Sequence, residues 1–182
     1  MSVASSAPQK TNARHEYVRQ NRVKTKGLHH VTAITSDVQR NIDFYVGLLG
    51  LRLAKRTVIQ EEPTTYHLFY GDAVGSVGTG ITFFDWPHVG HDRVGARNDV
   101  RTFYTVATTA ALAWWSDRFD KARVAYSVRQ DFAARESLHF EDPEGQRLGI
   151  VAAGSFAGYA HWDANVAAPH QALQALHSVT LG

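Results

Sequence analysis

The order of expected secondary-structure elements recurs along the chain, and this recurrence constrains the fold more than any single motif does. In the first copy, residues 27–85, the alternating stretch Leu28–Ile34 precedes a helix that Ser36 or Asp37 would cap and Gly50 would end. Three β-rich stretches follow, at Leu51–Ile59, Thr65–Tyr70 and Gly80–Phe84. The second copy, residues 99–152, repeats the order at Asp99–Thr108, Ala110–Ala122, Val124–Arg129, Ser137–Glu141 and Gln146–Ala152. Two βαβββ units predict an α+β fold made of paired modules.

The remaining segments read as connections, with one exception at the end of the chain. Residues 86–98 contain proline and glycine residues that interrupt regular structure, so we expect a loop there. We expect residues 153–175 to be a linker. Residues 176–181 then repeat the opening residues 28–33 at four of six positions. We therefore expect residues 176–182 to be the first strand of a truncated third module.

The amino-acid composition limits the chemistry that is available. The 182-residue chain has no cysteine and ten histidines. Disulfides, thiolate zinc sites, iron–sulfur clusters and cysteine nucleophiles are therefore excluded, and any metal must be held by imidazole and oxygen ligands. The absence of disulfides agrees with a cytoplasmic location. No stretch approaches the roughly 18 apolar residues of a membrane-spanning helix, so no membrane partner is expected.

Positive charge is concentrated at the start of the chain. Residues 1–26 carry a net charge of +5, and residues 27–182 carry −3 with histidine neutral. A mildly acidic body argues against nucleic acid as a partner. Because residues 1–26 have no apolar core, they are not a secretory signal, and we expect a disordered basic leader.

Two stretches carry a family resemblance. One reads GLHHVTAITSDVQRNIDFYVGLLGLRLAKRTV and the other, a closing hairpin, reads HFEDPEGQRLGIV. Both resemble the vicinal oxygen chelate superfamily, the group of glyoxalases, bleomycin-resistance proteins and extradiol dioxygenases. Further similarity to its hydroquinone-type ring-cleaving dioxygenases lies in Lys55-Arg56-Thr57, Tyr66–Tyr70, Trp114-Trp115 and residues 177–180, where the opening strand sequence is repeated. The resemblance implies a glyoxalase-like fold, with vicinal oxygen chelate modules at 27–85 and 99–152 whose curved mixed sheets surround a cleft.

The resemblance also implies a metal site of which this chain holds one part. Members of the branch look like chains of four modules in which two histidines and a glutamate bind Fe(II) or Mn(II). His30 corresponds to the first ligand, His29 to its hydrogen-bonding neighbour, and the other two ligands belong to the fourth module. The expected function is the N-terminal portion of a ring-cleaving dioxygenase for a small hydroquinone- or catechol-like aromatic and O2. We expect this chain to be incomplete as an enzyme, and Fe(II) or Mn(II) need not be bound at His30 in this chain alone.

Residue patterns refine these expectations. Strand alternation places His29 on the opposite face from His30, so His29 is not expected to coordinate the metal. His67 is a candidate substrate contact. Single-domain relatives commonly carry a glutamate four residues past the glycine of the DPxG turn, but Gly149 occupies that position here. The strand at 100–107 also lacks His, Asp and Glu, and the second module is therefore not expected to hold a metal.

Two other functions remain open on the sequence alone. One is a metal-dependent lyase or isomerase of the glyoxalase type, assembled as a homodimer to which each chain contributes His30. Stoichiometric metal in a purified dimer would favour it. The other is a metal-free binding protein like the bleomycin-resistance proteins. Tight binding of an aromatic ligand that a chelator does not change would favour that function.

Overall fold

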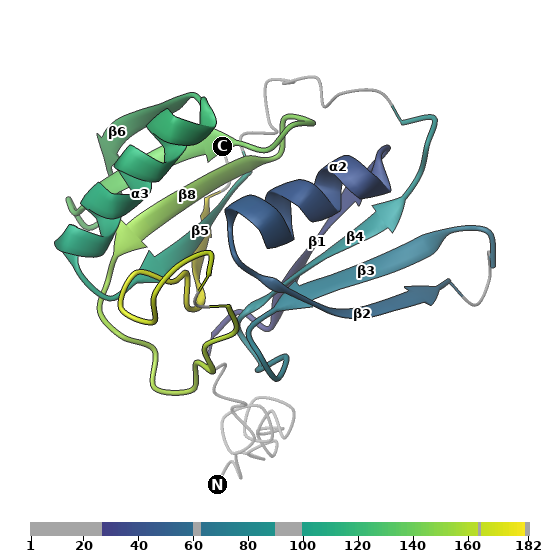
Figure 1. Cartoon of the computed structure of the whole chain (residues 1–182), viewed down its shortest axis with the longest axis horizontal. Coiled ribbons are helices and arrows are strands. Elements are labelled where there is room, and N and C mark those ends of the chain that lie inside the picture. Colours follow the sequence, from purple (N-terminus) through teal and green to yellow (C-terminus); the bar gives the residue numbers. More distant parts are fainter. Residues whose placement is uncertain (1–26, 60–62, 90–99, 164, 181–182) are drawn as a thin grey trace, which may run out of the picture.

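The chain folds into two βαβββ modules that lie side by side (Figure 1). The computed structural model describes residues 27–59, 63–89, 100–163 and 165–180. Residues 1–26, expected to be a basic leader, lie outside the described residues, as do residues 90–98 of the expected loop.

Each module contains one helical segment and four strands. The first comprises β1 (His30–Thr35), α2 (Val38–Ile42) continuing as the π-helix η1 (Asp43–Leu48), β2 (Arg52–Val58), β3 (Tyr66–Gly71) and β4 (Gly80–Asp85). The second comprises β5 (Arg101–Val106), α3 (Thr109–Ala122), β6 (Tyr126–Gln130), β7 (Glu136–Glu141) and β8 (Arg147–Ala152). The expected α+β order of paired modules is confirmed.

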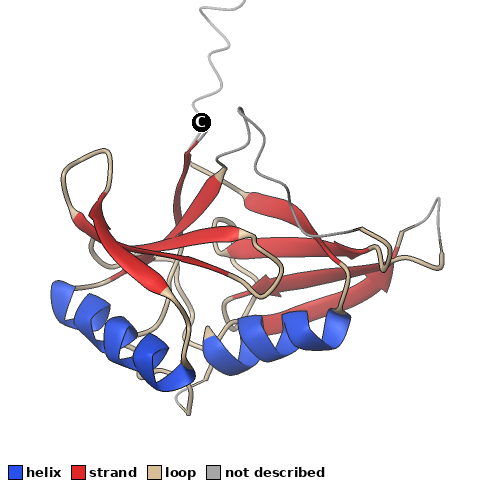
Figure 2. Cartoon of the chain, turned by 90° about the horizontal axis from the view of Figure 1, so that it is seen from above, coloured by secondary structure: helices blue, strands red, loops and turns tan. Residues whose placement is uncertain are grey.

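The strands form two mixed sheets, and the helices cover one side of both. The strand orders are β1-β4-β3-β2 and β6-β7-β8-β5-β9. In each module the opening strand runs parallel to the closing strand, β1 with β4 and β5 with β8. The helices lie in one layer on the same side of the sheets (Figure 2). Within the described ranges, the opposite face of each sheet therefore carries no helix.

The first helix begins and ends where the sequence predicts, but its hydrogen bonding changes partway. The Asp37 side chain accepts from the Arg40 backbone N–H at 3.0 Å, and Gly50 follows the helix with φ of +74°. A single α-helix was expected, whereas the last six residues are π-helical, with Leu49 N–H donating to the Phe44 carbonyl. The smaller rotation per residue of a π-helix lets the neighbouring Phe44 and Tyr45 rings both face the core.

Contacts between the modules fix their relative position. The fully buried Tyr45 hydroxyl donates to Asp142 Oδ2 at 3.1 Å. Arg118 donates from Nε to the Leu48 carbonyl at 2.9 Å. The Glu144 carboxylate accepts hydrogen bonds from the end of β1 and the residue after it. The opening strand of the first module is thereby tied to the β7–β8 turn of the second.

Residues 153–175 form no helix or strand among those described, yet they differ from a free linker. Leu173 and Ala172 are buried in the common core. The Trp115 indole, fully buried on α3, donates to the Gln171 carbonyl at 2.7 Å. Small apolar side chains let this irregular segment fill the space beside α3, and it belongs to the folded unit.

The last strand, β9 (Leu176–Thr180), is the edge of the second sheet. It pairs antiparallel with β5, and the Leu176 N–H donates to the Gly78 carbonyl in the β3–β4 turn at 2.7 Å. Its assignment to a third module stays a prediction. In the described part of the chain, no helix has the length and apolar character needed to cross a bilayer.

Candidate functional site

His30 opens β1 on the face of the first sheet that carries no helix. Val31 and Ala33 pack against the core, so the alternating His30, Thr32 and Ile34 point to the other side and are exposed. Strand register places further side chains on this side, and the Thr82 hydroxyl donates to the Thr32 hydroxyl at 3.0 Å across it. We call this side the open face; its members are His30, Thr32, Ile34, Lys55, Thr57, His67, Phe69, Thr82 and Phe84.

The imidazole of His29 contacts that of His30, although strand alternation predicts opposite faces. The two Nδ1 atoms are 2.9 Å apart and the rings are nearly perpendicular. His29 precedes the first residue of β1, so the strand does not fix its direction. One Nδ1 must donate and the other accept, and among the described residues none bonds to His30 Nε2.

A cavity of about 260 Å³ lies beside this histidine pair. Its lining includes His29, His30, Lys55, Phe69 and Thr82, and no described lining residue is acidic. A larger cavity of about 740 Å³ lies against β6 and β7 of the second module. None of the open-face residues lines it, whereas His30 lines the cavity of about 260 Å³, and we therefore assign the candidate site to that cavity.

An aromatic stripe crosses the open face next to the cavity. His67 lies between Phe69 and Phe84, with ring centroids 4.0 Å and 4.2 Å apart, and Phe84 stacks on Trp86. His67 does not line the cavity itself. Its Nε2 is buried, and no described residue hydrogen-bonds to it. Burial, followed by the electrostatic effects of the neighbouring His30 and Lys55, lowers the pKa of His67 from its ordinary value. Its role as a substrate contact stays a prediction.

On the second sheet, a phenyl ring fills the position that corresponds to a metal ligand in single-domain relatives. Phe103 on β5 lies opposite Gly149 on β8. A Cβ atom on residue 149 would lie 2.4 Å from both Cδ1 and Cε1 of the Phe103 ring. The His139 ring packs edge-on against the same phenyl group. The close approach of Phe103 thus explains why residue 149 is glycine.

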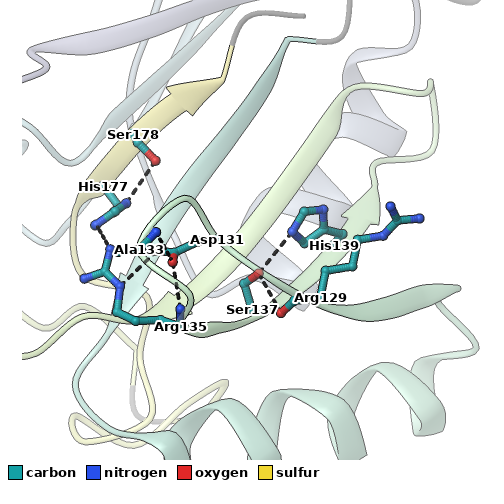
Figure 3. A network of polar contacts seen from close by, with 8 residues as sticks. All are labelled: Arg129, Asp131, Ala133, Arg135, Ser137, His139, His177 and Ser178. Carbon is teal, nitrogen blue, oxygen red and sulfur yellow. Dashed lines mark hydrogen bonds and ion pairs between the residues drawn. The ribbon is translucent and has the colours of Figure 1, made fainter.

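A polar network on the second sheet also contains histidine, and its hydrogen bonds link Asp131, Arg135, His177 and Ser178 (Figure 3). Arg135 pairs with Asp131 at 2.6 Å and contacts His177 Nε2 at 2.8 Å. Because arginine can only donate, His177 Nε2 accepts and its Nδ1–H donates to the Ser178 hydroxyl at 2.9 Å. His177 therefore cannot take the proton of Ser178, and the pair is not an activated nucleophile.

This network predicts that stability falls on acidification. Burial and the Arg135 guanidinium hold the pKa of His177 below its ordinary value, and Asp131 only partly opposes them. The unfolded chain therefore binds this proton more readily, so the stabilisation is complete above about pH 6.5 and is lost as the pH falls below it. Urea unfolding across that range should show a steeper loss for the wild type than for His177→Gln. Equal pH dependence in both proteins would contradict the assignment.

Among the residues of the open face, His30 is the candidate metal ligand. His30 fits as a ligand, because its Nδ1 is engaged and its Nε2 has no partner among the described residues. Within the described ranges, no group of three His, Cys, Asp or Glu side chains is placed to hold a metal ion.

Sequence reasoning did not single out Phe84, Phe103 or a functional role for Lys55. Aromatic residues at alternating positions of β3 and β4 were the available signal for the stripe.

Comparison with known proteins gives a consistent result. Residues 27–150 match the family model described as Glyoxalase/Bleomycin resistance protein/Dioxygenase superfamily. The chain is 44% identical over 137 residues to "Putative ring-cleaving dioxygenase MhqA" of Bacillus subtilis, a match that covers 75% of this chain and 43% of that protein. It is 28% identical over 159 residues to "Chlorohydroquinone/hydroquinone 1,2-dioxygenase" of Sphingobium indicum, covering 86% of this chain and 50% of that protein.

A solved structure agrees with these sequence matches. The crystal structure of a putative dioxygenase from Bacillus subtilis superimposes with a TM-score of 0.67 at 36% identity, over 86% of this chain and 49% of that one. The chain spans about half the length, or less, of the curated relatives that it matches.

Proposed function

The chain belongs to the Glyoxalase/Bleomycin resistance protein/Dioxygenase superfamily, and on that premise we propose that it is the N-terminal portion of a ring-cleaving dioxygenase that uses Fe(II) or Mn(II). Its substrates would be a small hydroquinone- or catechol-like aromatic and O2. The names of relatives that extend over about twice its length support the reaction class.

One observation carries the proposal: His30 stands at the rim of an aromatic-lined face, while Phe103 closes the β8 position at which single-domain relatives carry a glutamate. The 260 Å³ cavity beside His30 has the aromatic side chain of Phe69 in its lining, which suits a flat ring. Phe103 over Gly149 leaves no room for a ligand in the second module. The chain thus offers one imidazole for a site that two further ligands, one of them a carboxylate, would complete.

The contact between His29 and His30 suits that role. A neutral His30 that binds metal through Nε2 carries its proton on Nδ1, and it can donate that proton to His29 Nδ1, 2.9 Å away. His29 then acts as a positioning residue that fixes the tautomer and the direction of the ligand ring. When bound, Fe(II) or Mn(II) with a two-histidine, one-carboxylate ligand set has adjacent open positions where a diphenol and O2 can meet.

The proposal is tested by comparing the chain alone with a chimera. In the chimera, residues 27–182 replace the matching part of MhqA. Both proteins are loaded with Fe(II) without oxygen, and O2 uptake is then measured with hydroquinone. We expect little or no turnover by the chain alone and turnover by the chimera. Robust turnover by the chain alone that His30→Ala abolishes would contradict its incompleteness. A folded, iron-loaded chimera that is inactive where MhqA is active would contradict the proposed function.

Removal of the positioning residue should weaken metal binding without unfolding the chain. Loss of an outer hydrogen-bond partner of a histidine ligand typically costs about 10–100-fold in metal affinity. We expect a loss of that size for His29→Ala in the chimera, measured by titration with Mn(II) and electron paramagnetic resonance of the free ion. His29→Asn, which keeps an acceptor, should retain more of the affinity. His88→Ala, in an exposed loop, is the matched control. An unchanged affinity in His29→Ala would remove His29 from the site.

A further inference from the structure

A β-bulge turns Lys55 toward the open face. Leu53 pairs with Tyr70 and Lys55 pairs with Phe69, so Ala54 is an extra residue on β2. Without the extra residue, alternation would keep Lys55 on the same side as Leu53, which packs against the core. Bulges occur next to binding sites because they redirect a side chain in this way. The Lys55 ammonium accordingly lies over the Phe69 ring, 5.7 Å from its centroid.

The charge of Lys55 is not neutralised by the described part of the protein. No ion pair joins the Lys55 ammonium to a described residue. It makes a cation–π contact with the Phe69 ring. The described residues that line the cavity include two histidines and this lysine but no carboxylate. An anion entering the cavity would therefore meet a positive charge that no described lining residue opposes.

The dimensions of the cavity favour a single ring. Its volume is about 260 Å³. An apolar protein cavity of roughly 150 Å³ accommodates benzene, so the larger space holds one ring with polar substituents. His30 and Lys55 stand on β1 and β2, three inter-strand spacings apart across the sheet, and Lys55 is level with Thr32, two residues along from His30, so their backbones are about 16 Å apart. Both side chains line the cavity, and Phe69, which also lines it, is on β3 between their two strands.

We infer that the cavity takes a monocyclic aromatic ligand that carries an anionic substituent, a carboxylate, and that Lys55 binds this group. The ring packs beside Phe69, its hydroxyl end faces His30, and its carboxylate faces the Lys55 ammonium. Lys55 thereby selects acidic hydroquinones over neutral ones. The inference rests on the proposed function for the identity of the ring, whereas the charge preference is a property of the open face.

A pair of matched ligands tests this inference on the metal-free chain. Gentisate is a hydroquinone with a carboxylate, and methyl gentisate is its neutral ester. Binding of each is followed by chemical-shift changes of backbone amides, with millimolar ligand at low ionic strength. An exposed ion pair contributes up to about 1 kcal/mol, so we expect gentisate to bind about fivefold more tightly than the ester. Added salt should reduce that preference, because it screens exposed charges.

Two substitutions on the same strand separate a specific contact from general charge. Lys55→Met should remove the preference for gentisate and leave binding of the ester unchanged, and Lys55→Arg should keep the preference. Arg56 lies next to Lys55 but on the other face of β2, where it stacks on Tyr66 at 3.9 Å. Arg56→Met changes the net charge equally and should leave the preference intact. The amide spectrum of each variant reports whether it is folded.

Three results would overturn the inference: no preference for gentisate in the wild type, equal effects of Lys55→Met and Arg56→Met, or equal loss of both ligands in Lys55→Met. These outcomes are distinct from failure of the proposed function. A Lys55-dependent preference together with an inactive chimera would reject the dioxygenase and keep the anion subsite. An active chimera without a charge preference would do the reverse.

Discussion

Replacing His30 with alanine is expected to abolish O2 uptake by the chimera that carries residues 27–182. The substitution removes a ligand, and its effect must therefore exceed the roughly 10–100-fold that loss of an outer partner costs in metal affinity or activity. His30 is exposed on an edge strand, so the variant should keep its thermal stability and its far-ultraviolet spectrum. The activity and the bound iron should fall together, because one imidazole is needed for both.

The control for this prediction is His88→Ala, which removes an exposed histidine outside the open face. It should change neither the iron content nor the rate. If His30→Ala retains both iron and turnover, the open face of the first sheet is not the metal site. A loss of activity with full iron content would instead assign His30 to the substrate and contradict its role as a ligand.

Replacing Gly149 with alanine should destabilise the chain, since a single methyl group would collide with the Phe103 ring at 2.4 Å. Overpacking of this kind typically costs about 1–3 kcal/mol. At about 2–4 °C per kcal/mol for a chain of this size, the midpoint of thermal unfolding should fall by roughly 2–12 °C. The clash involves ring atoms held between β8 and His139, so the neighbour cannot simply swing away.

Gly47→Ala is the matched control, because a Cβ there meets no atom within 4 Å. In a helical position that change should stabilise by roughly 0.5–1 kcal/mol. The pair Phe103→Leu and Gly149→Ala forms a double-mutant cycle in which the alanine should cost less once the ring is gone. Equal costs of Gly149→Ala in both backgrounds would show that Phe103 is not the reason for the glycine.

Much of the fold follows from local patterns in the sequence. The repeated βαβββ order, the cap at Asp37 and the left-handed Gly50 each depend on nearby residues, and the structure confirms them. The membership of His30 in the open face follows from period-2 alternation along β1. The sequence also shows that Gly149 stands where single-domain relatives commonly carry a glutamate. The reason for the glycine, the Phe103 ring, lies on a strand more than forty residues earlier.

Features that depend on packing between distant segments could not be predicted in the same way. The π-helical turns bury Phe44 and Tyr45 against the second module, and residues 153–175 gain their place by contact with Trp115. Lys55 reaches the open face only because one extra residue at Ala54 shifts the alternation of β2. Nothing in the order of residues around Ala54 marks that bulge.

Paramagnetic broadening by Mn(II) tests most directly whether this chain presents a single ligand at His30. Substoichiometric Mn(II) is added to the isolated chain, and the intensities of assigned amide and imidazole signals are followed. His30 and its neighbours across β1 and β4, Thr32 and Gly80, should lose intensity first, and His30→Ala should remove the effect. Broadening that begins at His88, His139 or His177, or that persists in His30→Ala, would contradict the account.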